Sequence, residues 1–513
     1  MNGAESLINA LAEAGVDACF ANPGTSEMQL VAAIDKQPKM RAVLCLFEGV
    51  VTGAADGYGR MADKPALTLL HLGPGFGNGT ANLHNARRAF SPVLNMIGDH
   101  ATYHLQYDAP LTADIEGFAK PVSAWIGVSK SPAHLAEVGL EAWAHAQQYP
   151  GRVTSFIAPA DHAWTETTAT PAIPGLTVAP KAQADDISAA ADALRAGNAA
   201  IMLGSMALRE EALFQAGRIV AATGARLITE TFFTRLQRGA GRVPVERLPY
   251  FGEQAADYLK DLNNLVFVGT KPPVSFFAYP DKPSWLSPEG ATLVQVADAT
   301  VDALDALTRI ADALEAPAAP AVLQARQTHA LESGPINSLE LGKIIANHLP
   351  ENAIVSDEGA TNGLGAFLMT GGAAAHDWLT LTGGAIGQGL PLALGAAIAC
   401  PEQKVIALQA DGSGMYTVQA LWSMVREDLD ITVMLINNNS YAILNIELER
   451  VGVKNPGPTA LSLLDLSNPC IQWTDIAKGM GMSAERVTTV DDLDAAMTRA
   501  MATRGPRLIE VMV

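Results

Sequence analysis

The stretch KVIALQADGSGMYTVQALWSMVREDLDITVMLINNNS, residues 404–440, indicates how the chain folds. It holds two apolar runs with the composition of buried strands, Lys404–Gln409 and Ile431–Ile436, with a helix-like segment between them. The first run leads into Asp411 and the second leads into Asn438. Parallel strands joined by one crossover bring their carboxyl ends to the same edge of a sheet, so we expect these two side chains to lie close together.

The two strand ends offer only oxygen atoms as possible metal ligands. Asp411 supplies a carboxylate, Asn438 supplies an amide oxygen, and a backbone carbonyl adds a third donor. Such an incomplete set suits Mg²⁺, which fills its octahedron with water and substrate phosphates. Either motif alone is more simply explained as a turn after a strand. Their occurrence together, each after a strand, favours a metal site.

This combination resembles the metal motif of thiamine-diphosphate-dependent enzymes, a Gly-Asp-Gly followed further along by a pair of carboxamides. The first glycine of that motif is Ala410 in this chain. The resemblance covers nearly the whole chain and is to the acetolactate synthase large subunit and to benzoylformate decarboxylase. It implies that thiamine diphosphate and Mg²⁺ are the cofactors. The implied metal ligands are Asp411, Asn438 and Ser440, and the implied cofactor contacts beside them are Gly412 and Ser413.

The composition limits the classes of protein to be considered. A chain of 513 residues is too long for a single core and is expected to form three domains of ordinary size. With 49% hydrophobic and 17% charged residues it is globular rather than disordered. The net charge of −19 argues against nucleic acid or an anionic membrane as a partner. An anionic small substrate stays compatible, because the charge of one site can differ from the average.

Cysteine use and the chain ends suggest the compartment. The four cysteines are scattered without a Cys-x-x-Cys pair, so buried thiols in a reducing compartment are expected. The start at Met1–Glu5 lacks the basic residues of a signal peptide. No apolar run is long enough to span a bilayer. We therefore expect a cytoplasmic protein without a membrane partner.

Strand-like and helix-like patterns alternate along the chain, which is typical of α/β domains with open, mostly parallel sheets flanked by helices. A segment rich in threonine, proline and alanine at 167–180 and a segment of alanine and proline at 314–322 are typical of linkers. The three domains expected are therefore 1–165, 180–315 and 330–513. By the resemblance, the first binds the pyrimidine of the cofactor and the third binds its diphosphate together with Mg²⁺.

Several elements can be placed from the sequence. A helix is expected to start at Ser26, which is a good N-cap. The run Gly73–Gly79 is expected to form a loop before a helix that ends near Arg88. The third domain is expected to open with a helix at Ile336–Leu349 and to close with a strand at Leu508–Val513. The strands expected in the first two domains are Val16–Phe20, Ala42–Phe47, Ala66–His71, Pro92–Ile97, Val153–Ile157, Ala199–Leu203, Arg226–Thr229, Asn264–Val268 and Thr292–Val296.

Glu48 is a second residue of functional interest. A lone carboxylate after a strand is usually a solvated cap, but Glu48 precedes small residues that end in AADGYGR at 54–60. This pattern resembles the pyrimidine-binding motif of the family. There the glutamate hydrogen-bonds N1′ of the aminopyrimidine and favours the tautomer that takes the proton from thiazolium C2. The resemblance implies that Glu48 is catalytic and binds the cofactor, and burial in an apolar site can raise the pKa of such a carboxylate.

The run Gly73–Gly79 also suggests a dinucleotide site, since Asp99 at the end of the next strand could bind a ribose. The pattern is incomplete because Thr80 stands where a third glycine is required. A nicotinamide-dependent dehydrogenase is therefore disfavoured. The Gly-Pro-Gly form is instead similar to a loop of acetolactate-synthase-like enzymes, and Phe76 within it is expected to line the substrate pocket.

Two loops of the third domain resemble cofactor-binding segments of the family. Gly383–Pro391 resembles the loop that places a large apolar residue beneath the bent cofactor, which makes Gly384 and Ile386 cofactor contacts. A glycine-rich helix start with a core isoleucine explains this run equally well. Gly359 and Ala360 follow a strand-like run at the place where the family binds diphosphate through backbone N–H groups.

Thr25 and His71 occupy places that face the substrate in benzoylformate decarboxylase, where an Asn-Pro-Gly-Ser loop and a histidine lie. The loop here is Asn22–Thr25, so a hydroxyl is kept, and Pro23 is expected to contact the cofactor. A histidine that titrates near neutrality can shuttle protons, although a lone histidine after a strand is more often structural. The second histidine of that decarboxylase has no counterpart in Pro273–Tyr279, which argues against simple decarboxylation.

The residues that follow the metal motif are expected to reach the substrate channel. Tyr441 and Ile443 are expected to contact the cofactor, and Leu444 is expected to line the substrate pocket. His100 and His104 would share a face suited to a metal only within a helix. We favour a loop there.

The resemblance implies an acetolactate-synthase-like carboligase. Such an enzyme decarboxylates a 2-oxo acid and transfers the acyl anion to a carbonyl acceptor. The alternative within the family is a benzoylformate-type decarboxylase or an aldehyde lyase, so the substrate is a 2-oxo acid, an aldehyde or both. FAD binds some of these synthases, but no clear motif for it is present in this chain.

A cofactor-binding protein without turnover belongs to a different class, and the intact Glu48, Asp411 and Asn438 argue against it. In the family the cofactor lies between the first domain of one subunit and the third domain of another. The resemblance therefore implies a homodimer or homotetramer with active sites between subunits.

Overall fold

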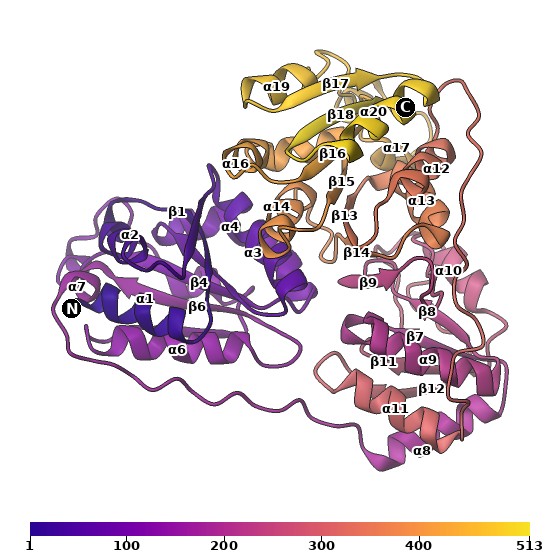
Figure 1. Ribbon diagram of the computed structural model, residues 1–513, viewed down its shortest axis with the longest axis horizontal. Coiled ribbons are helices and arrows are strands. Elements are labelled where there is room, and N and C mark those ends of the chain that lie inside the picture. The colour runs from indigo at the N-terminus through magenta and orange to yellow at the C-terminus, as the bar shows by residue number, and fades with distance from the viewer.

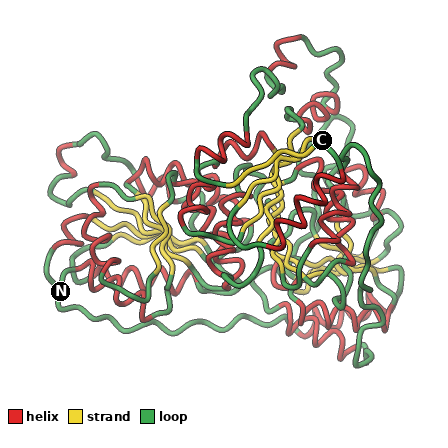
Figure 2. Tube along the Cα trace, turned by 45° about the horizontal axis from the view of Figure 1, so that its top comes forward, coloured by secondary structure: helices red, strands yellow, loops and turns green.

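The computed structural model describes residues 1–513 and contains three β-sheets, which largely follow one another along the chain (Figure 1). Helices flank the sheets, whose strands are drawn in yellow in Figure 2. The sheets are mostly parallel, which confirms the α/β architecture expected from the alternating pattern. None of the helices combines the length and the apolar composition needed to cross a bilayer.

The first sheet has six parallel strands in the order β2-β1-β3-β4-β6-β5. The chain passes from β1 to β2 on one side and returns to β3 on the other, and the carboxyl ends at such a switch point are where ligands bind. The bounds are β1 Ala18–Asn22, β2 Arg41–Leu44, β3 Ala66–Leu70, β4 Val93–Asp99, β5 Trp125–Val128, β6 Val153–Pro159, α1 Gly3–Glu13, α2 Met28–Asp35, α3 Glu48–Ala62, α4 Leu72–Arg88, α5 Ile115–Ala119, α6 His134–Ala146 and α7 Ala160–Trp164.

The expectation of a loop at Gly73–Gly79 is wrong, because this run forms the first turns of α4. Thr52 of α3 donates a hydrogen bond to the Gly79 carbonyl (2.9 Å), and a Cβ on Gly79 would lie 2.7 Å from the Thr52 methyl carbon. The missing side chain therefore lets α4 pack closely on α3. The expected helix start at Ser26 also differs, since Thr25–Glu27 form a 3₁₀ turn before α2.

The central sheet has five parallel strands in the order β10-β8-β7-β11-β12. Strands β7, β8 and β11 have the bounds expected from the sequence, since each is a short run of mostly buried apolar side chains. An extended segment at 165–183 leads from the first sheet to α8 and runs along the lower side of Figure 1. The bounds are β7 Ala199–Leu203, β8 Arg226–Thr229, β10 Glu246–Arg247, β11 Asn264–Val268, β12 Thr292–Ala297, α8 Ala184–Arg195, α9 Glu210–Thr223, α10 Gly252–Leu259 and α11 Ala303–Ala313.

The third sheet has seven strands in the order β17-β18-β16-β15-β13-β14-β9. Its switch point lies between β13 and β15, so the ends of these two strands and of β16 form the second candidate edge for a ligand. The bounds are β13 Ala353–Glu358, β14 His376–Thr380, β15 Val405–Ala410, β16 Ile431–Asn437, β17 Ser483–Val487, β18 Arg507–Met512, α12 Ser338–His348, α13 Ala360–Met369, α14 Gly389–Ala399, α15 Asp411–Gly414, α16 Ala420–Arg426, α17 Ala442–Arg450, α18 Pro458–Ser462, α19 Trp473–Gly479 and α20 Val490–Ala502.

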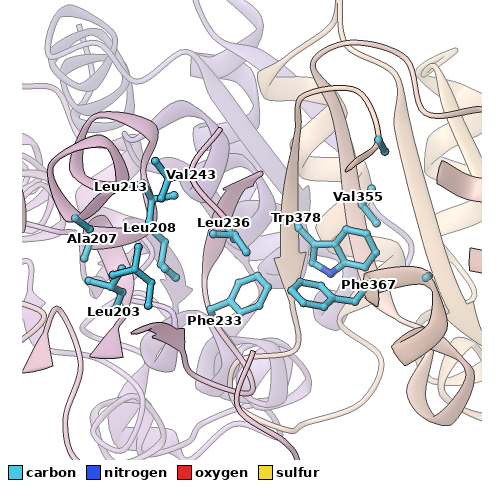
Figure 3. Packing of buried hydrophobic residues seen from close by; sticks show 14 of the residues in the cluster. Leu203, Ala207, Leu208, Leu213, Phe233, Leu236, Val243, Val355, Phe367 and Trp378 are labelled. Carbon is cyan, nitrogen blue, oxygen red and sulfur yellow. The ribbon is translucent and has the colours of Figure 1, made fainter. Parts of the chain in front are cut away.

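Strand β9 (Arg235–Arg238) comes from the central part of the chain but joins the third sheet, antiparallel to β14. Figure 3 shows Phe233 and Leu236 beside Phe367 and Trp378, and these four side chains belong to one hydrophobic core. The central part is therefore fixed to the third sheet by a shared core. The sequence does not indicate this strand, because Leu236 is its only apolar residue.

Helices α3 and α14 join the first sheet to the third, and they lie against each other in Figure 1. They cross so closely that a Cβ on Gly395 would overlap the carbonyl oxygen of Ala54. Only glycine permits this separation of the two backbones. The crossing places the N-terminus of α3 beside the loop that precedes α14.

A buried ion pair adds to this contact. Asp56 and Arg60 of α3 lie 2.8 Å apart and neither side chain is exposed. Arg60 also donates hydrogen bonds to the carbonyl oxygens of Thr234 (3.1 Å) and Thr380 (2.8 Å), which belong to the central and third parts. Through these contacts, the motif that follows Glu48 holds three parts of the chain together. Removing one partner of a buried pair costs several kcal/mol.

Candidate active site

The first cluster of candidate residues lies at the carboxyl ends of β1, β2 and β3. Glu48 is the first residue of α3, and His71 follows β3 directly. A Cβ on Gly75 would lie 3.3 Å from Glu48 Oε1 and 3.3 Å from His71 Cβ. Glu48 Oε1 and the Cβ of His71 therefore border the same space, which Gly75 leaves free because it has no side chain.

Glu48 is half-buried, and its Oε2 accepts a hydrogen bond from Nδ2 of Asn78 (3.0 Å). Its Oε1 faces Gly75 instead. A carboxylate with one oxygen held by an amide can accept a further hydrogen bond from a ring nitrogen. The sequence alone does not indicate Asn78, because its contact depends on how α4 packs on α3.

His71 is held by the loop at the end of β1. Its Nδ1 lies 2.7 Å from Oε2 of Glu27 and 3.3 Å from Oγ of Ser26. A Cβ on Gly24 would overlap the imidazole, so the loop passes directly against the ring. Glu27 is fully buried and is a functional candidate that the sequence reasoning missed. Its one signal is the Gly-x-x-Glu spacing, which lets Glu27 accept the Gly24 N–H (2.7 Å), one half of a capping box.

The other residues expected around this cluster differ in exposure. Thr25 is exposed and Pro23 is partly exposed, so both can meet a ligand. Phe76 is fully buried in the hydrophobic core that includes α3 and α4. Its side chain supports α4 and, contrary to the expectation, does not line an open pocket in this chain.

The second cluster lies at the ends of β15 and β16. These strands pair in parallel with Ala410 opposite Ile436, so Asp411 and the segment after Asn437 meet at one edge. Asp411 Oδ1 accepts the Gly412 N–H (2.9 Å), whereas its Oδ2 is buried without a hydrogen-bond partner. Burial raises the pKa of Asp411 above its ordinary value. A bound cation would satisfy the unpaired Oδ2, so this residue fits a metal site.

The loop after β16 is folded on itself. Asn438 Oδ1 accepts the Ser440 N–H (3.0 Å), and Ser440 Oγ donates to the Leu464 carbonyl (3.2 Å). Asn439 has a left-handed backbone with φ +54°, which asparagine tolerates. An amide oxygen has two lone pairs, so Asn438 can still bind a metal. No group of three His, Cys, Asp or Glu side chains suited to a metal is present, and the oxygen donors at this edge fit Mg²⁺.

Glu358, the last residue of β13, was not indicated by the sequence. It accepts hydrogen bonds from the N–H groups of Gly387 (2.6 Å) and Gly389 (2.5 Å). Burial raises the pKa of Glu358 to about 7, although these donors act in the opposite direction. Gly359 caps α13, and Ala360 is exposed with φ +49°. Glu358 therefore joins the expected diphosphate segment to the loop before α14.

The loop with Ile386 is also held from the first part of the chain. Asn85 of α4 donates to the Ala385 carbonyl (2.7 Å), and its Oδ1 accepts the Ala385 N–H (3.1 Å). Gly384 lies under Phe276, where a Cβ would stand 2.5 Å from the ring. Ile386 remains partly exposed, so the alternative of a core isoleucine at a helix start is disfavoured.

Helix α17 begins directly beside the second cluster. The Tyr441 ring lies against Gly412, and burial raises the pKa of the Tyr441 hydroxyl. Ser413 Oγ accepts a hydrogen bond from Gln409 Nε2 (2.6 Å). Ile443 is partly exposed and Leu444 is 43% exposed, so both remain open to a ligand or to a second chain.

A charged network behind α17 was not expected. Glu447 lies one turn after Ile443, and both of its carboxylate oxygens are buried without a hydrogen-bond partner. Arg450 pairs with Glu253 of α10 through two contacts (2.5 and 2.9 Å) and holds its Nε 3.6 Å from Glu447. These charges fix α17, and with it the segment after the metal motif, to the central part of the chain.

The two clusters are not linked directly within one chain. No hydrogen bond or ion pair connects the group around Glu48 and His71 with the group around Asp411 and Asn438. Each cluster holds only part of the set expected for a complete active site. His100 and His104, whose ring centroids are 5.4 Å apart, lie outside any α-helix, and no group of side chains suited to a metal is found there.

Family models match both ends of the chain. The thiamine pyrophosphate enzyme N-terminal TPP binding domain matches residues 1–119, and the C-terminal TPP binding domain of the same enzymes matches residues 364–511. Thiamine pyrophosphate is another name for thiamine diphosphate. The matched ranges contain the first and second clusters respectively, apart from the segment around Glu358.

Whole-chain relatives agree with these models. The chain is 50% identical to IlvX of Mycobacterium tuberculosis, provisionally named an acetolactate synthase large subunit, over 100% of this chain and 99% of that protein. It is 27% identical to benzoylformate decarboxylase of Pseudomonas aeruginosa, over 97% and 96% of the two chains. The fold is that of the 4-hydroxybenzoylformate decarboxylase of Rhodococcus jostii, with a TM-score of 0.86, 22% identity and 100% and 99% coverage. The chain therefore belongs to the thiamine-diphosphate-dependent enzymes.

Proposed function

We propose that the chain decarboxylates a 2-oxo acid and transfers the acyl group to a carbonyl acceptor, in the manner of an acetolactate synthase. The observation that carries the proposal is that Glu48 Oε1 and the Cβ of His71 both lie 3.3 Å from the position of a Cβ on Gly75. The carboxylate for the cofactor and the residue that would act on the substrate are then close neighbours. The 50% identity to a protein named as an acetolactate synthase large subunit supports the carboligase form.

The cofactor would be held by groups from both clusters. Thiamine diphosphate, when bound, supplies the nucleophilic carbon and the electron sink for decarboxylation. Glu48 would accept a hydrogen bond from its pyrimidine, and Asp411, Asn438 and Ser440 would bind Mg²⁺ at the diphosphate. The buried, unpaired Oδ2 of Asp411 supports this assignment, because an ionised oxygen in that place needs a cation. The backbone at Gly359 would contact the diphosphate.

His71 and Thr25 would act on the substrate. Thr25 is exposed beside the loop that holds the ring, and its hydroxyl can orient a carboxylate or carbonyl oxygen. His71 uses Nδ1 for Glu27, which leaves Nε2 to exchange a proton with a substrate oxygen.

We further propose that two copies of the chain complete each active site. The domain at 1–165 of one copy would meet the domain at 330–513 of the other, while 180–315 stays with its own chain. Support comes from the incompleteness of each cluster alone and from large exposed apolar side chains near both. These side chains include Tyr103 and Tyr107 after β4, Tyr416 beside the metal edge and Leu463 after α18.

A benzoylformate-type decarboxylase or aldehyde lyase is the second candidate. It is favoured by the Asn22–Thr25 loop together with His71, which lie in contact. The central part offers no histidine at Pro273–Tyr279 to act as the second proton donor. Carboligation does not require that donor, and we therefore rank the carboligase before the decarboxylase.

The test is a product screen with 2-oxo acids, alone and with aldehyde or 2-oxo acid acceptors, followed by mass spectrometry. Activity should require thiamine diphosphate and Mg²⁺, and dialysis against EDTA should abolish it until Mg²⁺ is restored. Coupled products support the carboligase, whereas free aldehyde alone supports the second candidate. Arms with and without FAD show whether that group is needed. Full activity after exhaustive EDTA treatment would refute the metal assignment.

A further inference from the structure

We propose that Glu27 is the positioning residue of the active site, which fixes His71 and the Gly24–Thr25 loop as one unit and directs Nε2 of His71 to the substrate. The role of His71 in turnover rests on the function proposed above. The contacts of Glu27 stand on the geometry alone. None of the family motifs described above includes Glu27.

Three hydrogen bonds converge on the Glu27 carboxylate. Its Oε2 accepts the Gly24 N–H (2.7 Å) and lies 2.7 Å from Nδ1 of His71. Its Oε1 accepts the Ser26 hydroxyl (2.7 Å). The three partners come from the loop after β1 and from the end of β3, which are far apart in the sequence. Glu27 therefore couples the two strand ends that flank the switch point of the first sheet.

The position of Glu27 is unusual for a carboxylate. Its side chain is 0% exposed, while that of His71 is 24% exposed. A Cβ on Gly98 would overlap Oε1, so the end of β4 also closes around it. A buried carboxylate is strongly destabilising unless it is hydrogen-bonded or paired. Its hydrogen-bond partners are His71 and the loop that lies against the His71 ring. The buried carboxylate therefore holds the candidate site in place and adds nothing to the hydrophobic core.

The contact decides which ring nitrogen of His71 can act. A carboxylate only accepts hydrogen bonds, so Nδ1 must carry a proton and the neutral ring keeps its lone pair on Nε2. Nε2 can then take a proton from a substrate oxygen and later return it. Nδ1 keeps its own proton throughout and donates it in a hydrogen bond to Glu27. Ionised Glu27 also stabilises the imidazolium formed in the first step. The proton count is unchanged over the cycle.

Other charges surround this pair. Asp99 at the end of β4 is close enough that the charge of Glu27 contributes to raising its pKa, after burial as the main cause. His100 donates its N–H to Asp99 (2.7 Å), and Glu48 lies across Gly75. Only Glu27 touches the His71 ring through a carboxylate oxygen.

The main test is a double-mutant cycle of E27Q and H71A, with turnover of the best 2-oxo acid from the product screen as readout. E27Q keeps the shape but removes the charge, and it should lower kcat by about 10- to 100-fold. In the H71A background the same change should cost less than about 3-fold, because Glu27 acts through His71. Thiamine diphosphate affinity should be the same in all four proteins. An equal loss in both backgrounds would overturn the inference and indicate a structural residue.

A second measurement does not depend on turnover or on a Glu27 variant. Histidine labelled with ¹⁵N in the whole protein, with His71 assigned by its loss in H71A, should show a proton on Nδ1 of His71. A ring without a proton on Nδ1 would overturn the inference. If the wild type converts no 2-oxo acid, the proposed function fails, and the tautomer still decides the role of Glu27.

Discussion

Glu358 illustrates at the scale of one residue how burial and hydrogen bonding oppose each other in this site. Its carboxylate has two backbone N–H donors, which favour the ionised form, yet burial raises its pKa to about 7. The ordinary value is 4.5. Protonation near neutral pH would relieve the larger cost of a buried charge, although it weakens one of the two acceptors that hold Gly387 and Gly389.

The pH dependence of stability tests this description. For an acid whose folded pKa is raised, the contribution to stability is present below the unfolded pKa and is lost as pH rises through the folded value. Between about pH 5 and about pH 8 the Tm of the wild type should therefore fall relative to that of E358Q, by about 2 °C or more. Thermal unfolding of both proteins across this range measures it. A constant difference between the two Tm curves would show that Glu358 does not titrate there.

Sequence reasoning found the residues that follow strands directly and missed those whose role depends on distant partners. Asp411 and Asn438 were found because each ends an apolar run, and the parallel pairing of β15 with β16 then brings them together. Glu27 and Glu358 were missed because their partners lie 44 and 29 residues away. Phe76 was misplaced because burial depends on the packing of α4, which no local pattern records.

At the scale of elements, the crossing of α3 and α14 sets the position of two functional termini. Glu48 begins α3, and the loop with Ile386 leads into α14. The carbonyl oxygen of Ala54 occupies the space of a side chain at Gly395. Any larger residue there must separate the helices and displace both termini.

Gly395→Ala should therefore destabilise the protein by about 1–3 kcal/mol through overpacking. It should also weaken thiamine diphosphate binding, since the loop before α14 moves. The matched control is Gly77→Ala, another helical glycine, where a Cβ would meet no atom within 4 Å. That change should be neutral or stabilise by about 0.5–1 kcal/mol. Calorimetry and cofactor titration measure both, and equal behaviour of the two variants would contradict the tight crossing.

Element prediction succeeded where one short apolar run makes one strand. Strands β7, β8 and β11 have the expected bounds for this reason. It failed at β9, which has a mostly polar sequence and is held as a strand by its antiparallel pairing with β14. It also failed at the start of α4, where glycine serves close helix packing and was taken as a sign of a loop.

At the scale of the whole molecule, the chain presents two partial sites on two different sheets. Glu48, His71 and Glu27 belong to the first sheet, and Asp411 and Asn438 belong to the third. The sequence could indicate both sets of strand ends. It could not indicate from local pattern how the sheets are arranged, because that depends on contacts such as α3 with α14 and on the strand that β9 adds to the third sheet.

The most direct test of the central claim, one thiamine-diphosphate site built from two copies, is the activity of mixed assemblies of two inactive variants. E48Q and D411N, carrying different affinity tags, are coexpressed, and assemblies that contain both are isolated by sequential purification. Each variant alone should be inactive. In a mixed dimer one site receives both defects and the other receives none, so about half of the wild-type activity should return. If Glu48 and Asp411 serve the same site from one chain, every site keeps one defect, and mixed assemblies no more active than the parents would contradict the claim.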